Sequence, residues 1–154
     1  HFENVLSSAA SIGVALVSCI PMLMDTGGNC GSQASTLAIR GLALGEIEPK
    51  DLWKVLWKEV RVALMLGFVL ALVNFLRIWF LTPYDRGVAF VVSIAMFFTI
   101  IIAKGIGATL PLLAKSIHLD PALMASPIIT TLVDAASLTI LFTVATVVFH
   151  LPAA

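Results

Sequence analysis

Charge is scarce in this sequence. Asp, Glu, Lys and Arg together make up 12% of its 154 residues, whereas hydrophobic residues make up 60%. The mean hydropathy is +1.05. A soluble domain carries about twice that charged fraction, roughly 25%. The composition therefore disfavours a soluble domain and predicts a membrane protein.

An excess of either charge is also missing. Nine basic residues balance nine acidic ones, so no basic face indicates a nucleic acid partner. Cysteine is limited to Cys19 and Cys30, which lie in one apolar segment without disulfide or metal-ligand spacing. No nucleophile–base pair or metal ligand set stands out, and we do not expect an enzyme.

The apolar runs do not alternate with a period of two residues, which disfavours strands. In lipid, only helices or closed barrels satisfy the backbone polar groups, so helices are expected. Four apolar segments are long enough for a bilayer, which takes ~20 residues of helix. We therefore expect an all-α, polytopic helical membrane protein, with residues 1–154 forming a single transmembrane domain. The four transmembrane helices are expected at about residues 5–44, 60–81, 87–114 and 121–151.

The connections between these segments differ in charge. The first and third connections hold six basic residues, against two around the second connection, which predicts that the first and third are cytoplasmic. The protein would then lie in the cell membrane, with both ends of the chain on the extracytoplasmic side. Because four spans with an external start are unusual without a signal peptide, we expect a fragment that lacks an odd number of upstream spans. The six residues are Arg40, Lys50, Lys54, Lys58, Arg61 and Lys115, and the two are Arg77 and Arg86.

The first connection continues as "PKDLWKVLWKEVRVAL". Pro49 is suited to the first turn of a helix. Basic residues then recur at helical spacing, and Trp53 and Trp57 are four residues apart. This pattern predicts a basic helix, anchored by tryptophan at the membrane interface, that continues as the second span.

The stretch "PMLMDTGGNCGSQAS", residues 21–35, puts polar residues and three glycines inside the first span. We expect the helix to break there, because glycine and the preceding proline loosen a helix and free carbonyl groups. Non-helical backbone at membrane depth lines a cavity or is buried in protein. Apart from Cys30, the stretch offers oxygen ligands, which suit hard cations such as Mg²⁺ or Ca²⁺.

Three charged residues lie within the spans: Asp25, Lys104 and Asp134. Counted from the cytoplasmic helix ends at 1.5 Å per residue, their depths are ~22, ~16 and ~21 Å, near the centre of a ~30 Å hydrocarbon core. Intramembrane charges are rare and usually functional. We therefore expect one polar site, with Thr130 and Asp134 on the same face of the last helix. Lys104 is expected to pair with Asp25, which could be purely structural.

Two stretches, "PMLMDTGGNCGSQASTLAIRGLALGEI" and "DPALMASPIITTLVDAASLTI", closely resemble the transmembrane domain of the MgtE magnesium transporters and the related SLC41 carriers. The Pro, Gly-Gly-Asn, Gly-x-Gln and Asp-Pro-Ala elements come in family order. The resemblance covers nearly the whole chain. It implies helices two to five of a five-helix subunit, with the upstream helix and the cytoplasmic regulatory domains absent.

The resemblance further implies a homodimer with the ion pathway along the dimer axis. Asp134 matches the pore aspartate, presented by both subunits to hydrated Mg²⁺, and Gly28, Thr36 and Thr130 match pore-lining positions. Asp25, Ser32 and Lys104 depart from the usual family residues, so Lys104 becomes a candidate gating or ion-pair residue. The expected metal-site residues are Asp25, Gly28, Asn29, Ser32, Thr36, Thr130 and Asp134.

Alternatives remain open. A secondary transporter could exchange Mg²⁺ for another cation such as Na⁺, with Lys104 and Asp25 changing partners as access alternates. A structural or sensor subunit would bind Mg²⁺ without carrying flux. Other divalent cations, Mn²⁺, Co²⁺ and Ca²⁺, are possible cargo, and the sequence does not separate a channel from an exchanger. The bilayer and a second copy of the chain are the expected partners.

Overall fold

Four long helices make up nearly all of the computed structural model, which describes residues 2–124 and 126–149. No strand occurs within these ranges, and the prediction of an all-α protein is confirmed. All four helices are long and apolar enough to cross a membrane. The elements are α1 (Phe2–Ala43), the 3₁₀ turn η1 (Pro49–Asp51), α2 (Leu52–Leu81), α3 (Arg86–Ser116), the 3₁₀ turn η2 (Pro121–Met124) and α4 (Ser126–Phe149).

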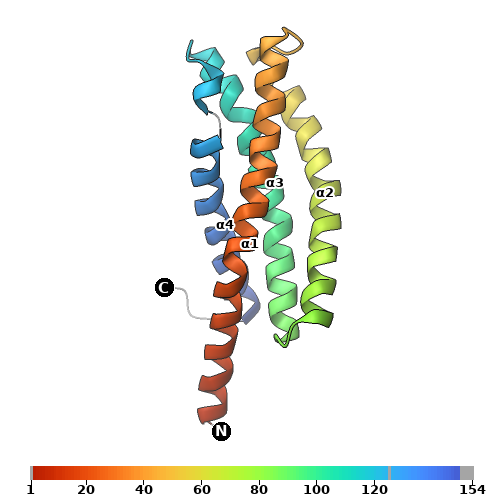
Figure 1. Ribbon diagram of the computed structural model, residues 1–154, viewed down its shortest axis with the longest axis vertical. Helices are drawn as coiled ribbons and strands as arrows, with labels where there is room; N and C mark the ends of the chain where they lie inside the picture. The colour runs from red at the N-terminus through yellow and green to blue at the C-terminus, as the bar shows by residue number, and fades with distance from the viewer. Residues whose placement is uncertain (1, 125, 150–154) are drawn as a thin grey trace.

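The helices lie alongside one another, with α3 at the centre (Figure 1). Helix α3 packs against each of the other three. Of its most apolar stretch 56% is buried, against 28% in α1, 17% in α2 and 22% in α4. The other helices therefore turn much of their apolar surface outward, where a bilayer would cover it. The α1–α2 and α3–α4 connections share one end of the bundle, and the α2–α3 connection lies at the other (Figure 1).

The first helix is not broken at its glycines, so that prediction is wrong. Helix α1 runs without interruption from Phe2 to Ala43, through Pro21 and the glycine-rich stretch. The glycines instead permit close contact with other helices. A Cβ atom on Gly27 would lie 2.7 Å from Val133 Cγ1, and one on Gly31 would lie 2.9 Å from Ile129 Cγ2. Small residues four apart are typical of tightly packed membrane helices.

The closest approach joins α1 to α3 at Gly31 and Gly107. A Cβ atom on Gly107 would overlap the backbone carbonyl of Gly31. Backbone atoms cannot turn aside as the end of a flexible side chain can. This contact therefore requires glycine at position 107 and sets the distance between α1 and α3.

Substituting Gly107 by alanine should destabilise the protein by about 1–3 kcal/mol, the usual cost of overpacking a well-packed site. Gly105→Ala is the matched control on the same helix, because the nearest atom to its new Cβ would be Leu56 Cδ1 at 3.8 Å. Thermal unfolding in detergent, followed by helical circular dichroism, should show a lower midpoint for Gly107→Ala alone. Equal midpoints for the two variants would contradict the close contact.

The expected helical turn at Pro49 is the 3₁₀ turn η1, which leads directly into α2. The backbone N–H of Glu48 donates to Asp51 Oδ2 at 3.0 Å, which closes this first turn. Trp53 and Trp57 are 78% and 64% exposed on the outer side of α2. Because α2 continues unbroken to Leu81, the basic, tryptophan-bearing stretch and the second span form one helix.

The other end of the bundle is fastened by polar contacts. Asp85 Oδ1 accepts a hydrogen bond from the backbone N–H of Gly87 at 2.7 Å and so caps α3. The hydroxyl groups of Ser18 and Tyr84 lie 3.0 Å apart and connect α1 to the α2–α3 connection. The Arg86 guanidinium lies 4.7 Å from the centre of the Trp79 ring. These contacts hold three helices together where the bundle would meet the membrane surface.

Candidate functional site

Two intramembrane carboxylates come together in one small cavity. Its volume is about 170 Å³, and it lies between the middle of α1 and α4. Asp25 is exposed and Asp134 is half-buried. The sequence predicted one polar site for Asp25, Lys104 and Asp134. Asp25 and Asp134 line this cavity, whereas Lys104 does not. The lining residues are Met24, Asp25, Gly28, Asn29, Thr130 and Asp134.

The cavity exists because α1 and α4 cross closely at small residues. A Cβ atom on Gly28 would lie 3.2 Å from Thr130 Cγ2, in tight contact. Two helical turns beyond Thr130 on α4, Ser137 is buried, and its hydroxyl donates to the Val133 carbonyl at 2.6 Å. Ser137 therefore belongs to the packed interface with Gly27, whereas Thr130 and Asp134 lie at the cavity.

Ser32 and Thr36 extend the same side of α1. They follow Gly28 by one and two helical turns, so the three positions lie along one face. The Thr36 hydroxyl donates to the Ser32 carbonyl at 2.9 Å. Neither residue lines the cavity around Asp134. The predicted set thus divides into a cavity group and a polar extension toward the α1–α2 connection.

The chemistry of the cavity is that of oxygen ligands. Carboxylate, amide and hydroxyl oxygens are available from Asp25, Asp134, Asn29 and Thr130. In the described part of the chain, no group of three or more His, Cys, Asp or Glu residues could hold a metal ion. One chain therefore offers two carboxylates, which suits Mg²⁺ because this ion usually keeps several of its waters and needs few protein ligands.

Lys104 does not pair with Asp25, and that prediction is wrong. Its ammonium Nζ lies 3.2 Å from Glu59 Oε2, and these side chains are 5% and 7% exposed. Lys104 is on α3 and Glu59 on α2, so the ion pair joins these helices and does not line the carboxylate cavity. Asp25 is left at the cavity with Asp134.

Glu59 is the residue that sequence reasoning missed. It was counted as part of a basic interfacial stretch, yet it is 5% exposed. A signal was present in the spacing. Glu59, Ala63 and Gly67 follow one another at four-residue intervals, all are buried, and small residues mark the packed face of a membrane helix.

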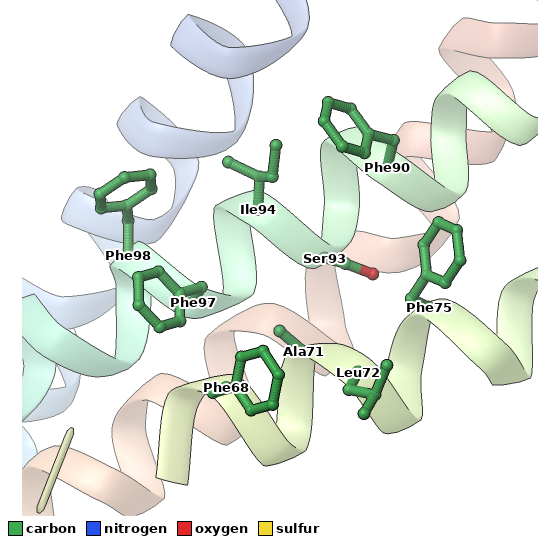
Figure 2. Close-up of a pocket in the computed structure, with 9 residues that line it drawn as sticks. All are labelled: Phe68, Ala71, Leu72, Phe75, Phe90, Ser93, Ile94, Phe97 and Phe98. Atoms are coloured by element: carbon green, nitrogen blue, oxygen red, sulfur yellow. The ribbon is translucent and has the colours of Figure 1, made fainter. Parts of the chain in front are cut away.

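A larger groove has a different character. Its volume is about 460 Å³, and it lies between α2 and α3. Figure 2 shows five phenylalanine rings around it and a single hydroxyl, that of Ser93. That hydroxyl accepts a hydrogen bond from Asn74 Nδ2 at 3.4 Å. A groove with one side-chain oxygen atom in its lining does not supply the oxygen ligands that Mg²⁺ or Ca²⁺ requires. The rings are those of Phe68, Phe75, Phe90, Phe97 and Phe98.

Four helices that are long and apolar enough to cross a membrane define a multi-pass membrane protein. Two carboxylates on a small cavity between such helices mark a candidate ion site. The chain belongs to the MgtE family, described as divalent cation transporters, whose sequence profile matches residues 20–144. The resemblance of the two motif stretches to the MgtE magnesium transporters is thereby confirmed.

Two curated relatives are similar over nearly all of the chain. The magnesium transporter MgtE of Thermus thermophilus is 34% identical over 149 residues, which are 94% of this chain and 31% of the relative. The magnesium transporter MgtE of Bacillus subtilis is 33% identical over 154 residues, which are 97% of this chain and 32% of the relative. The chain thus spans about a third of the length of these relatives.

Proposed function

We propose that this chain is a membrane domain through which Mg²⁺ crosses the cell membrane. The observation that carries the proposal is the meeting of Asp25 and Asp134 in one cavity with oxygen donors. A carboxylate at the bilayer centre costs about 3 kcal/mol on insertion scales. Two carboxylates in one cavity therefore need a cation or water to offset this cost. The relatives named as magnesium transporters support Mg²⁺ as that cation.

The full site in this proposal is formed by two copies of the chain. One copy supplies a shallow cavity with an exposed Asp25 and a half-buried Asp134. A two-fold axis beside the cavity doubles every ligand. Paired Asp134 carboxylates then hold hydrated Mg²⁺, with Asp25, Gly28, Asn29 and Thr130 around it and Ser32 and Thr36 along the path. Coordination through retained water selects for Mg²⁺, which loses its waters reluctantly.

The direction of transport in this proposal is inward. The six basic residues of the first and third connections belong to one end of the bundle, which supports a cytoplasmic location for that end (Figure 1). A divalent cation entering the cell gains about 4.6 kcal/mol per 100 mV of membrane potential. No coupled ion is then required. Exchange for Na⁺ is the alternative, but its expected switch between Lys104 and Asp25 has lost its support, because Lys104 pairs with Glu59.

Flux into liposomes tests this function. The full-length protein should let Mg²⁺ enter vesicles loaded with a Mg²⁺-sensitive dye. The rate of entry should rise when the vesicle interior is made negative. Imposing a Na⁺ gradient should leave the rate unchanged. A rate that follows the Na⁺ gradient would instead establish the exchanger, and Mg²⁺ binding without any flux would establish a sensor or structural role.

A further inference from the structure

A second cavity lies between α1 and α2, away from the carboxylate site. Its volume is about 300 Å³, within the ~300–1,000 Å³ range of small-molecule sites. The α1 side consists of the last turns of that helix, from Ala34 to Gly41. The α2 side consists of its basic first turns. The cavity therefore opens at the end of the bundle that carries the α1–α2 connection.

Three cations border this cavity on one face of α2. Lys54, Lys58 and Arg61 occupy positions i, i+4 and i+7, a span of ~10 Å along the helix axis. All three are exposed, and among the described residues none of them forms an ion pair with a carboxylate. Lys50 differs, because its ammonium lies 2.7 Å from Glu48 and outside the cavity.

Two carboxylates also line the cavity, and they do not balance these cations. Glu59 is already paired with Lys104. That leaves Glu46 against three basic side chains. The electrostatic balance of the cavity therefore favours an anion.

The rest of the lining is apolar and lies at interfacial depth. Leu37, Ala38 and Ile47 form the wall opposite the cations. Trp53 and Trp57 precede Lys54 and Lys58 by one residue each and are largely exposed. Tryptophan concentrates at the level of lipid headgroups. The cations and the apolar wall therefore lie where a headgroup meets its acyl chains.

We propose that this cavity binds an anionic glycerophospholipid. Lys54, Lys58 and Arg61 hold the phosphate and headgroup, and the glycerol and upper acyl chain lie against Leu37, Ala38 and Ile47. Basic pockets between membrane helices are known to bind such headgroups. The lipid fills the space between α1 and α2 and so braces α1, the helix that also carries Asp25. A free phosphate compound would use the cations but would leave the apolar wall uncovered.

Lipid binding to the full-length protein in detergent tests the proposal without depending on transport. Native mass spectrometry compares retention of phosphatidylglycerol with that of phosphatidylcholine. The variant K54Q/K58Q/R61Q should bind phosphatidylglycerol ~100-fold more weakly, since each basic contact near a headgroup contributes roughly fivefold.

The control for lost charge is K50Q/K115Q, which removes two exposed basic residues that do not line this cavity. It should bind phosphatidylglycerol as the unmodified protein does. If the triple variant proves unstable, the single change K58Q should weaken binding about fivefold. The proposal is overturned if the two variants lose binding equally, if phosphatidylcholine binds as tightly, or if glycerol phosphate competes at the same concentration as the lipid.

Discussion

Asp134→Asn should reduce Mg²⁺ flux in liposomes by about 10–100-fold while the protein still folds. A carboxylate that accepts hydrogen bonds from the waters of the ion contributes about 1.5–3 kcal/mol per contact, and 1.4 kcal/mol corresponds to a factor of ten. The neutral amide loses this charge-assisted contribution but keeps the shape of the side chain. Asp25→Asn should have a smaller effect, because Asp25 is more exposed than Asp134.

Thr139→Val is the matched control for this measurement. Thr139 is exposed on α4, and its hydroxyl donates to the Ala135 carbonyl at 2.8 Å, away from the lining of the cavity. Its flux should match that of the unmodified protein. Undiminished flux in Asp134→Asn would remove Asp134 from the ion path.

The same substitution can test whether two copies share the site. Unmodified and Asp134→Asn chains carrying different affinity tags can be co-expressed and purified over both tags. If two Asp134 carboxylates hold one ion, this mixed dimer should lose well over half of its flux. Half of the flux remaining would mean that each chain conducts alone, and failure to recover any doubly tagged protein would contradict the dimer.

Glu59→Gln should be the most destabilising polar substitution in the bundle, by about 3–5 kcal/mol. It leaves the Lys104 ammonium buried without its carboxylate, and an uncompensated buried charge is far more costly than a missing pair. Lys104→Met should be comparably harmful, because it leaves Glu59 unpaired. The double variant Glu59→Met with Lys104→Met should recover most of the lost stability, since apolar side chains of similar volume can replace a buried ion pair.

Lys50→Gln provides the comparison for an exposed ion pair. The Lys50 and Glu48 side chains are 74% and 59% exposed, and such pairs contribute about 0–1 kcal/mol. Unfolding midpoints in detergent should therefore barely change for Lys50→Gln. A double variant no more stable than Glu59→Gln alone would contradict the account of Glu59 and Lys104 as one interacting pair.

The helical class and the four spans were predictable from the sequence for a simple reason. A bilayer admits only fully hydrogen-bonded backbone, and length and hydropathy then determine the number of spans. The carboxylates of the candidate site were also predictable. Asp25 and Asp134 stand alone in long apolar runs, and a charge at that depth has few explanations besides function.

The glycines show where local reasoning was insufficient. Glycine lowers the stability of an isolated helix, which suggested a break in α1. The same residue also permits helices to touch, as at Gly27 and Gly31, and packing there more than offsets the weak helix propensity. Only the neighbouring helices decide which of these opposite effects wins.

The sequence by itself therefore determined the class of protein and the number of helices long enough to span a membrane, because hydropathy and helix length act locally. It also singled out the two acidic positions of the candidate site. The tertiary structure alone decided how the charges are paired. Lys104 is 45 residues from Glu59 along the chain, yet their atoms lie 3.2 Å apart because α2 and α3 pack side by side. Coulombic attraction and desolvation depend on distances in space, and those distances exist only once the helices have packed.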